Sequence, residues 1–162
     1  MILPKMPANE AKRLSSLYEY HLLDTPPEKE YDDITRIASQ ICEMPISTIT
    51  LVDDTRQWFK SDQGMGFKET PRELAFCAHA IVEPDKVMVV NDSLNDIRFH
   101  DHPDVVGGIK IGFYAGVPLV NADGYALGTL CVVDHKPNHL SEVKLEALKA
   151  LANQVVTQFE MR

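Results

Sequence analysis

The segment Glu69-Thr-Pro-Arg-Glu-Leu-Ala-Phe-Cys-Ala-His-Ala-Ile81 decides the fold, and it opens a stretch that reaches Asp134. Its Thr-Pro-x-Glu start has the form of a capping box, in which the threonine caps the first turn and the glutamate bonds back to the cap. We therefore predict a helix that begins at Thr70. On it, Cys77 shares one face with the aliphatic residues, and His79 shares a second face with the preceding phenylalanine.

Three strands follow this helix. Val87-Met-Val-Val90 has no polar interruption and is predicted to be a central strand. Ile111–Val120 alternates in bulk, Asn121-Ala-Asp-Gly124 is a hairpin turn, and Tyr125–Val133 returns antiparallel. With the helix, the small and aromatic side chains of these strands predict one wall of a pocket.

The other elements come from periodicity and from cap and turn residues. They are a flexible arm at 1–9, a helix from 10 to about 23, a helix from the Asp-Thr-Pro-Pro at 24–27 to before 45, a strand at 46–52, its hairpin partner at 57–60, a loop at 61–68, a short helical turn at 95–100, and a final helix capped by Ser141. No strand–helix–strand repeat has dinucleotide-fold spacing. The order predicts an α+β domain with a central antiparallel sheet of about five or six strands and helices on both faces.

Composition narrows the class of function. The 162 residues are enough for one domain, with 44% hydrophobic residues and a net charge of −8. Scattered acidic residues argue against binding to nucleic acid or to an anionic membrane surface. Cys42, Cys77 and Cys131 lie far apart without a CxxC pair, and no apolar run approaches the ~20 residues of a membrane span. We expect a cytoplasmic protein with reduced thiols.

These segments, taken together, resemble a GAF domain of the N-terminal sensory type found in bacterial histidine kinases and diguanylate cyclases, with a PAS-like architecture. The matching motifs are Leu22-Leu-Asp-Thr-Pro-Pro-Glu28, Leu51-Val-Asp53, Arg56-Gln-Trp-Phe-Lys-Ser61, Glu69-Thr-Pro-Arg-Glu73, Phe76-Cys-Ala-His-Ala-Ile81, Phe113-Tyr-Ala-Gly116 and Leu127-Gly-Thr-Leu-Cys-Val-Val-Asp134. The resemblance implies a single domain over residues 10–162, with the first and last helices packed together on one face of the sheet. It implies a small-molecule pocket on the other face but specifies no cofactor, because GAF domains bind cyclic nucleotides, bilins, haem or other small molecules.

Six residues are candidates to line that pocket: Cys77, His79, Asp92, Arg98, Tyr114 and Cys131. Arg72, Arg98 and Lys110 are cations that could hold an anionic ligand, with Tyr114 as an aromatic wall. In the alternative interpretation, Arg98 pairs with Asp92 or Asp96 and only fixes its loop.

Catalysis is not expected. Cys77 and His79 are two residues apart on a helix, so their side chains diverge and cannot form a Cys–His dyad. The alternative is a thiol-based redox sensor, or an enzyme of the free methionine sulfoxide reductase type, using Cys77 and Cys131. That enzyme family's key cysteine, however, has no counterpart before Val117-Pro-Leu119. His100 and His102 flank a carboxylate and could ligate a metal, but they leave the site incomplete.

GAF domains that bind cyclic nucleotides carry a spaced Asn-Lys-Phe-Asp-Glu set, which cannot be placed in this sequence. In bilin-binding GAF domains the attachment cysteine lies later in the fold than Cys77. The final helix remains apolar-periodic to its end, through Leu145, Leu148, Val155 and Phe159. A sustained apolar stripe is typical of a helix-bundle seam. We therefore hypothesise a non-catalytic sensory domain that dimerises through its terminal helices and transmits a ligand signal to an output domain.

Overall fold

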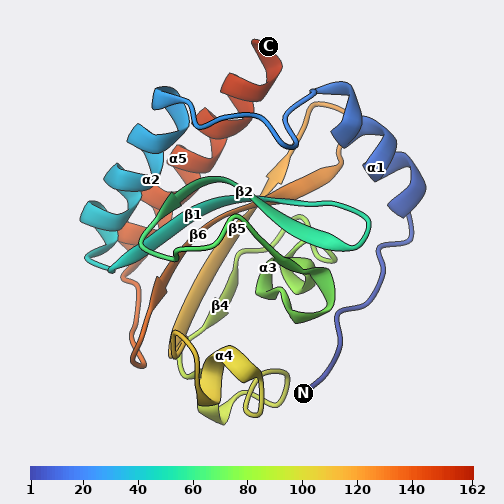
Figure 1. Cartoon of the computed structure of the whole chain (residues 1–162). Coiled ribbons are helices and arrows are strands. Elements are labelled where there is room, and N and C mark those ends of the chain that lie inside the picture. Colours follow the sequence, from blue (N-terminus) through green and yellow to red (C-terminus); the bar gives the residue numbers. More distant parts are fainter.

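The computed structural model describes all residues from 1 to 162 (Figure 1). The helices and strands are, in chain order, α1 (Glu10–Glu19), α2 (Lys29–Cys42), β1 (Ile46–Val52), β2 (Arg56–Gln63), β3 (Glu69–Pro71), α3 (Phe76–Ala80), β4 (Met88–Val90), α4 (Pro103–Val106), β5 (Phe113–Val120), β6 (Ala126–Asp134) and α5 (Glu142–Glu160), with 3₁₀ turns at Arg72–Leu74 and Ser93–Asn95.

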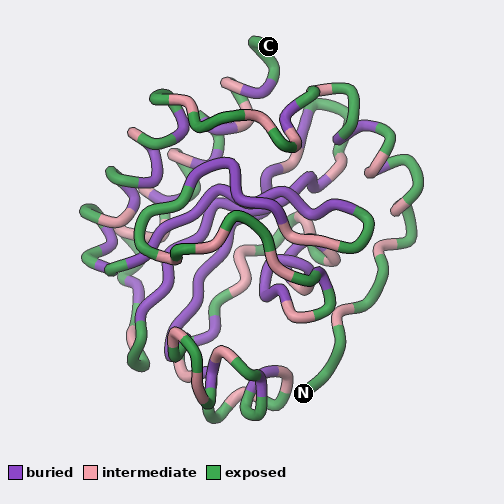
Figure 2. The backbone as a smooth tube through the Cα atoms, in the orientation of Figure 1, coloured by how far each residue is buried: buried purple, intermediate pink, exposed green.

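One six-stranded sheet organises the chain, in the order β3-β2-β1-β6-β5-β4, and every neighbouring pair is antiparallel. The predicted α+β fold is confirmed. Helices α2 and α5 cover one face, and α3 packs on the other (Figure 1). Figure 2 shows the central strands buried almost throughout, whereas α2 alternates between buried and exposed residues because only one of its faces meets the sheet.

The main core lies between the sheet and the α2–α5 layer. Its members come mainly from these two helices and from one face of β1, β2, β5 and β6, and include Ile34, Ala38, Phe113, Leu148 and Phe159. The periodic apolar stripe of α5 is therefore used within the domain itself. Ser141 caps this helix as predicted, because its side-chain oxygen accepts a hydrogen bond from the Lys144 amide.

The helix that packs along α5 is α2, so the implied pairing of the first and last helices is wrong. α1 reaches α5 only near its own end, where Tyr20 contacts Phe159 and bonds to Glu160. The cause is Arg13, which is 1% exposed and donates to the carbonyl oxygen of Val52 at the end of β1 and to that of Ala126 at the start of β6. These bonds hold α1 across the end of the sheet.

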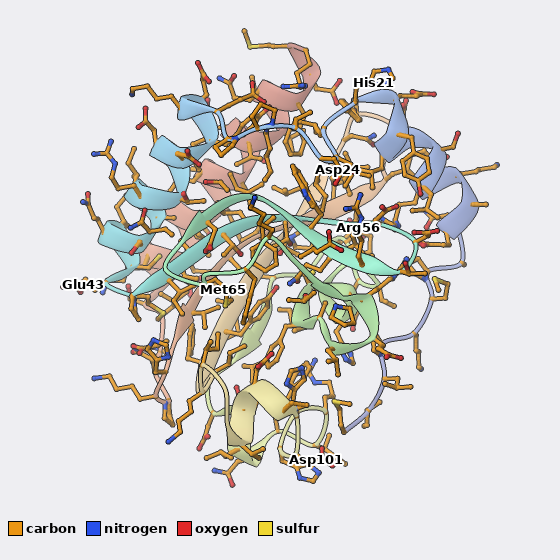
Figure 3. All side chains as sticks on the ribbon, viewed as in Figure 1. His21, Asp24, Glu43, Arg56, Met65 and Asp101 are labelled. Atoms are coloured by element: carbon orange, nitrogen blue, oxygen red, sulfur yellow. The ribbon has the colours of Figure 1, made fainter.

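Ion pairs extend this anchoring to the α3 side. Glu10 receives hydrogen bonds from Arg13 and Arg72, and Arg72 also donates to the carbonyl oxygen of Asp53. Nearby, Arg56 holds Asp24, which has a positive φ, by two bonds of 2.8 Å (Figure 3). The network fixes the α1–α2 connection against β2.

The predicted helix from Thr70 to Ile81 is wrong in its first half. Thr70 lies in β3, where it accepts a hydrogen bond from the Gln57 side chain of β2, and the helix starts only at Phe76. The predicted central strand at 87–90 is also wrong, since β4 is an edge strand whose Val89 is 37% exposed. α1 ends at Glu19, before the predicted position, and α2 begins at Lys29. The segment at 1–9 has no regular structure, and its Ile2 amide donates to the Arg98 carbonyl oxygen.

Candidate functional site

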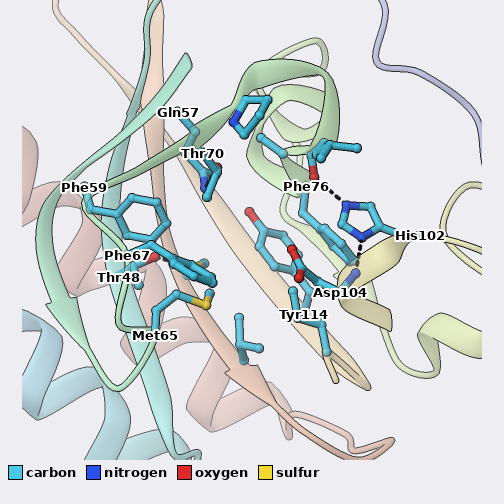
Figure 4. A pocket seen from close by; sticks show the side chains of 16 residues that line it. Thr48, Gln57, Phe59, Met65, Phe67, Thr70, Phe76, His102, Asp104 and Tyr114 are labelled. Carbon is cyan, nitrogen blue, oxygen red and sulfur yellow. Dashed lines mark hydrogen bonds between the residues drawn. The ribbon is translucent and has the colours of Figure 1, made fainter. Parts of the chain in front are cut away.

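A cavity of about 90 Å³ lies on the face of the sheet opposite α2 and α5 (Figure 4). The strands β1, β5 and β6 form its floor, the β2–β3 connection forms one side, and α3 with the α4 segment forms the other. Its lining residues are Thr48, Gln57, Phe59, Met65, Phe67, Thr70, Pro71, Leu74, Ala75, Phe76, His102, Asp104, Ile111, Tyr114, Cys131 and Val133. The walls are mainly apolar and the polar groups few, as is usual for small-molecule sites.

The floor carries hydroxyl and thiol groups that alternate with apolar residues, as the period of a strand requires. The Thr48 hydroxyl lies 2.9 Å from the Cys131 sulfur, and the Tyr114 hydroxyl lies 3.4 Å from that of Thr129. A side chain at Gly116 would come within 2.3 Å of the Tyr114 hydroxyl, so the glycine makes room for the phenol. Burial raises the pKa of Tyr114 well above its ordinary value, so the phenol keeps its proton.

Aromatic rings build the wall on the α3 side. Phe76 stacks on Phe99 with ring centroids 3.9 Å apart and an angle of 7° between the rings. His102 meets the edge of Phe76 and is buried. Its Nδ1 accepts the Asp104 backbone N–H at 2.9 Å, so the proton is on Nε2, which donates to the Leu74 carbonyl oxygen at 2.6 Å. Nδ1 therefore caps α4, and Nε2 joins the α4 segment to the turn before α3 (Figure 4).

The structure separates the six candidate residues into three groups. Tyr114 and Cys131 line the cavity, and Cys77 is buried behind it, where its thiol donates to the Gln57 side-chain oxygen. His79 and Arg98 lie instead at a second surface cleft, between α3 and β4. Asp92 lies on the loop after β4 and accepts a hydrogen bond from Asn95.

The cations considered for an anionic ligand all lie outside the cavity. Arg72 is paired with Glu10, and Lys110 is exposed. Arg98 is paired with Asp96 at 2.8 Å, as the alternative interpretation predicted. None of these three cations would therefore contact a ligand in this cavity.

The thiols and histidines have ordinary structural surroundings. Burial raises the pKa of Cys77 to about 12 and that of Cys131 to about 11, so both stay protonated at neutral pH. Burial, together with the nearby Arg98, lowers the pKa of His79 to about 4. His100 is exposed while His102 is fully bonded, and no group of three or more potential ligands converges on one point to hold a metal.

Sequence reasoning missed the side of the cavity formed by the β2–β3 connection. Met65 and Phe67 alternate with Gly64 and Gly66, both of positive φ, and turn their side chains inward. Asp62 holds this turn by accepting the amides of residues 65 and 66. The sequence did offer a signal for this side of the cavity, since apolar residues alternate with glycines in the loop predicted at 61–68.

The fold, the position of the cavity and the motifs agree with the match of a family model, described as GAF domain, to residues 26–159. The chain belongs to the GAF domain family. Over 159 residues it is 36% identical to a cyclic di-GMP phosphodiesterase of Pseudomonas aeruginosa, a match that covers 98% of this chain and 27% of that protein. The chain thus spans about a quarter of the length of this curated relative.

Solved GAF domains share the fold at much lower identity. The GAF domain of an Acinetobacter phosphoenolpyruvate-protein phosphotransferase has a TM-score of 0.65 and 14% identity, covering 93% of this chain and 94% of that one. The blue-light-absorbing form of the PixJ GAF domain from Thermosynechococcus elongatus has a TM-score of 0.67 and 14% identity, covering 91% and 89%. None of the helices is long and apolar enough to span a membrane.

Proposed function

We propose that this chain is a non-catalytic sensory GAF domain that binds a small molecule in the cavity of Figure 4 and passes the signal to an output domain through its helices. The observation that carries the proposal is the cavity itself. It combines apolar walls with the inward hydroxyls of Thr48 and Tyr114, and it lies on the face of the sheet away from α5. Protein interiors hold few voids larger than a water molecule, so an apolar cavity of this size supports a binding role.

The route of the signal follows from the alternation of β5. Tyr114 faces the cavity, whereas its neighbours Phe113 and Ala115 belong to the core shared with α2 and α5. A ligand that moves the β5 backbone therefore shifts side chains directly beneath α5. Packed interfaces respond to such shifts by changing between discrete arrangements.

The identity with the phosphodiesterase supports a place in a longer signalling protein. The 98% coverage of this chain by one segment of that enzyme indicates that the domain is used as a module. We propose that such an output activity, in the cytoplasm, is what the domain regulates. The catalytic alternative is disfavoured, because the raised pKa values of Cys77 and Cys131 remove the thiolate that redox chemistry needs.

Dimerisation is proposed for the α2–α5 layer, since α1 is anchored elsewhere. Ile37 and Ile41 lie one turn apart on the outer side of α2 and are 38% and 41% exposed. In a homodimer, these residues would meet a second copy across the helical layer, and α5 of each copy would lie beside the seam. Light scattering tests this: we expect a dimer for the native chain and a monomer for the Ile37→Lys variant, and a native chain that is monomeric at all concentrations contradicts it.

Native mass spectrometry of protein purified without denaturation tests the ligand proposal. A retained molecule adds mass that is lost on unfolding. Cys131→Met places extra atoms in the cavity, and Cys42→Met makes the same change at a buried thiol on the other face of the sheet. We expect the added mass to disappear in the first variant only. Absence of bound mass, together with an output activity that Cys131→Met leaves unchanged, would overturn the proposal.

A further inference from the structure

The lining of the cavity carries negative charge and no positive charge. None of its sixteen lining residues is a lysine or an arginine, and the single ionisable carboxyl among them is that of Asp104. His102 contributes no charge in this arrangement, because its Nδ1 accepts a backbone hydrogen bond and so carries no proton. A bound anion would have no counter-charge and would face a carboxylate.

The Asp104 carboxylate has no partner within the chain. Only its backbone groups are bonded, to the His102 ring and to the Ile111 amide. Its side chain points from α4 toward the cavity, beside the ring of Tyr114 (Figure 4). Gly108 leaves it uncovered, since a side chain there would lie 2.6 Å from a carboxylate oxygen. A half-buried carboxylate without a donor is a binding group for a cation or a hydrogen-bond donor.

The rest of the lining suits the same ligand. Phe59, Phe67, Phe76 and Tyr114 surround the space with aromatic rings. Ring faces attract organic cations, and aromatic walls beside a carboxylate are how proteins recognise ammonium groups. Cavity size limits the ligand, because about 90 Å³ is well below the ~150 Å³ of a cavity that accepts benzene.

We infer that the cavity selects small organic cations, amines or methylated ammonium compounds of a few heavy atoms, with Asp104 as the counter-charge and specificity-determining residue. This inference rests on the proposed function and assigns its ligand class. Anionic ligands such as nucleotides are rejected by the same arrangement, because their phosphates would be desolvated without a cation. Met65 and Phe67 line the side of the cavity opposite Asp104 and would contact the apolar part of the ligand.

A charge series on one carbon skeleton tests the inference. Isobutylamine, isobutanol and isobutyrate are nearly equal in shape and differ in charge, and their binding to the full chain is followed by amide chemical shifts of cavity residues at constant ionic strength. We expect the amine to bind about tenfold or more tightly than the alcohol, and the carboxylate to bind least. Tighter binding of the alcohol or the carboxylate overturns the inference.

Asp104→Asn removes the charge and keeps the shape. We expect amine affinity to fall about tenfold or more, with isobutanol affinity changed by less than about twofold. Asp85→Asn, an exposed carboxylate outside the cavity, is the matched control and should change neither. Unchanged amine affinity in Asp104→Asn overturns the inference. If that variant does not fold, the charge series on the native chain decides alone.

The outcomes separate the two proposals. Binding of isobutanol in preference to the amine leaves the cavity as a ligand site and refutes only the assignment of charge. Binding of none of the three compounds refutes the cation assignment, whereas the proposed function is then judged by the retained mass and by the output activity of Cys131→Met.

Discussion

Replacement of Arg13 by methionine should destabilise the domain strongly. The guanidinium donates to the Val52 carbonyl oxygen at 2.8 Å and to the Ala126 carbonyl oxygen at 3.3 Å. It also donates to both carboxylate oxygens of Glu10, at 2.6 and 3.1 Å. Methionine is long and unbranched and fills much of the same space, so the loss is chiefly one of hydrogen bonds and charge.

The magnitude follows from what is left behind. A buried carbonyl without a donor costs about 1–3 kcal/mol, and removing one partner of a buried ion pair costs about 3–5 kcal/mol. Glu10 retains its bond of 2.6 Å to Arg72, so the second figure is an upper bound. We expect the free energy of unfolding to fall by about 3 kcal/mol, which is a large part of the stability of a small domain.

Urea unfolding followed by the fluorescence of the buried Trp58 measures the loss, with Lys12→Met, an exposed change in the same helix, as control. Burial by itself would raise the pKa of Glu10, but hydrogen bonds from Arg13 and Arg72 outweigh it and hold the pKa below its usual value of 4.5. Stabilisation from such a group is present above the unfolded pKa and is lost as the pH falls through the folded pKa.

The difference between native chain and Arg13→Met should therefore be largest near neutral pH and shrink in acid. A loss below about 1 kcal/mol at neutral pH, or a loss that does not shrink in acid, would refute the anchoring role of this residue.

Three further predictions concern single groups. The thiols of Cys77 and Cys131, with pKa values raised to about 12 and 11, should resist alkylation at pH 8 in the folded chain and react after unfolding, and rapid native-state labelling seen by mass spectrometry would contradict this. His79 should titrate near pH 4 by NMR; because its folded pKa lies below the ordinary value, its contribution to stability is lost as the pH falls from about 6.5, a loss that should be absent in His79→Gln. Gly128→Ala should prevent native folding, as shown by loss of the cooperative thermal transition, because the new Cβ would lie 1.8 Å from the Thr50 carbonyl oxygen; a folded variant of native stability would contradict the close strand approach.

Local pattern was sufficient wherever a segment's burial follows from its own periodicity. The strand at Ile46–Val52 was predicted with the bounds that the structure shows, and Phe113 and Leu119 lie on the face of β5 that the alternation indicated. The Ser141 cap is equally local, since a cap bond acts within a few residues.

Local pattern misled where a segment finds its partners far away in the chain. Thr70 has the form of a helix cap, yet its hydroxyl accepts a hydrogen bond from Gln57 across a strand pair, and such tertiary pairing overrides a cap that contributes only about 1 kcal/mol. Arg98 and Tyr114 were grouped as one site, although Arg98 is held by Asp96 at another cleft. The positions of these two residues in the sequence do not reveal that their side chains lie at different clefts.

The sequence by itself therefore determined the family, the antiparallel sheet and the segment from Glu69 to Asp134 as one wall of the pocket. Only the tertiary structure decided which side chains face the cavity and what charge it carries. The physical reason is that a cavity is bounded by residues from separate elements: Met65, Phe76, Asp104 and Tyr114 come from four of them. Their convergence is set by strand register and helix packing, which no single segment encodes.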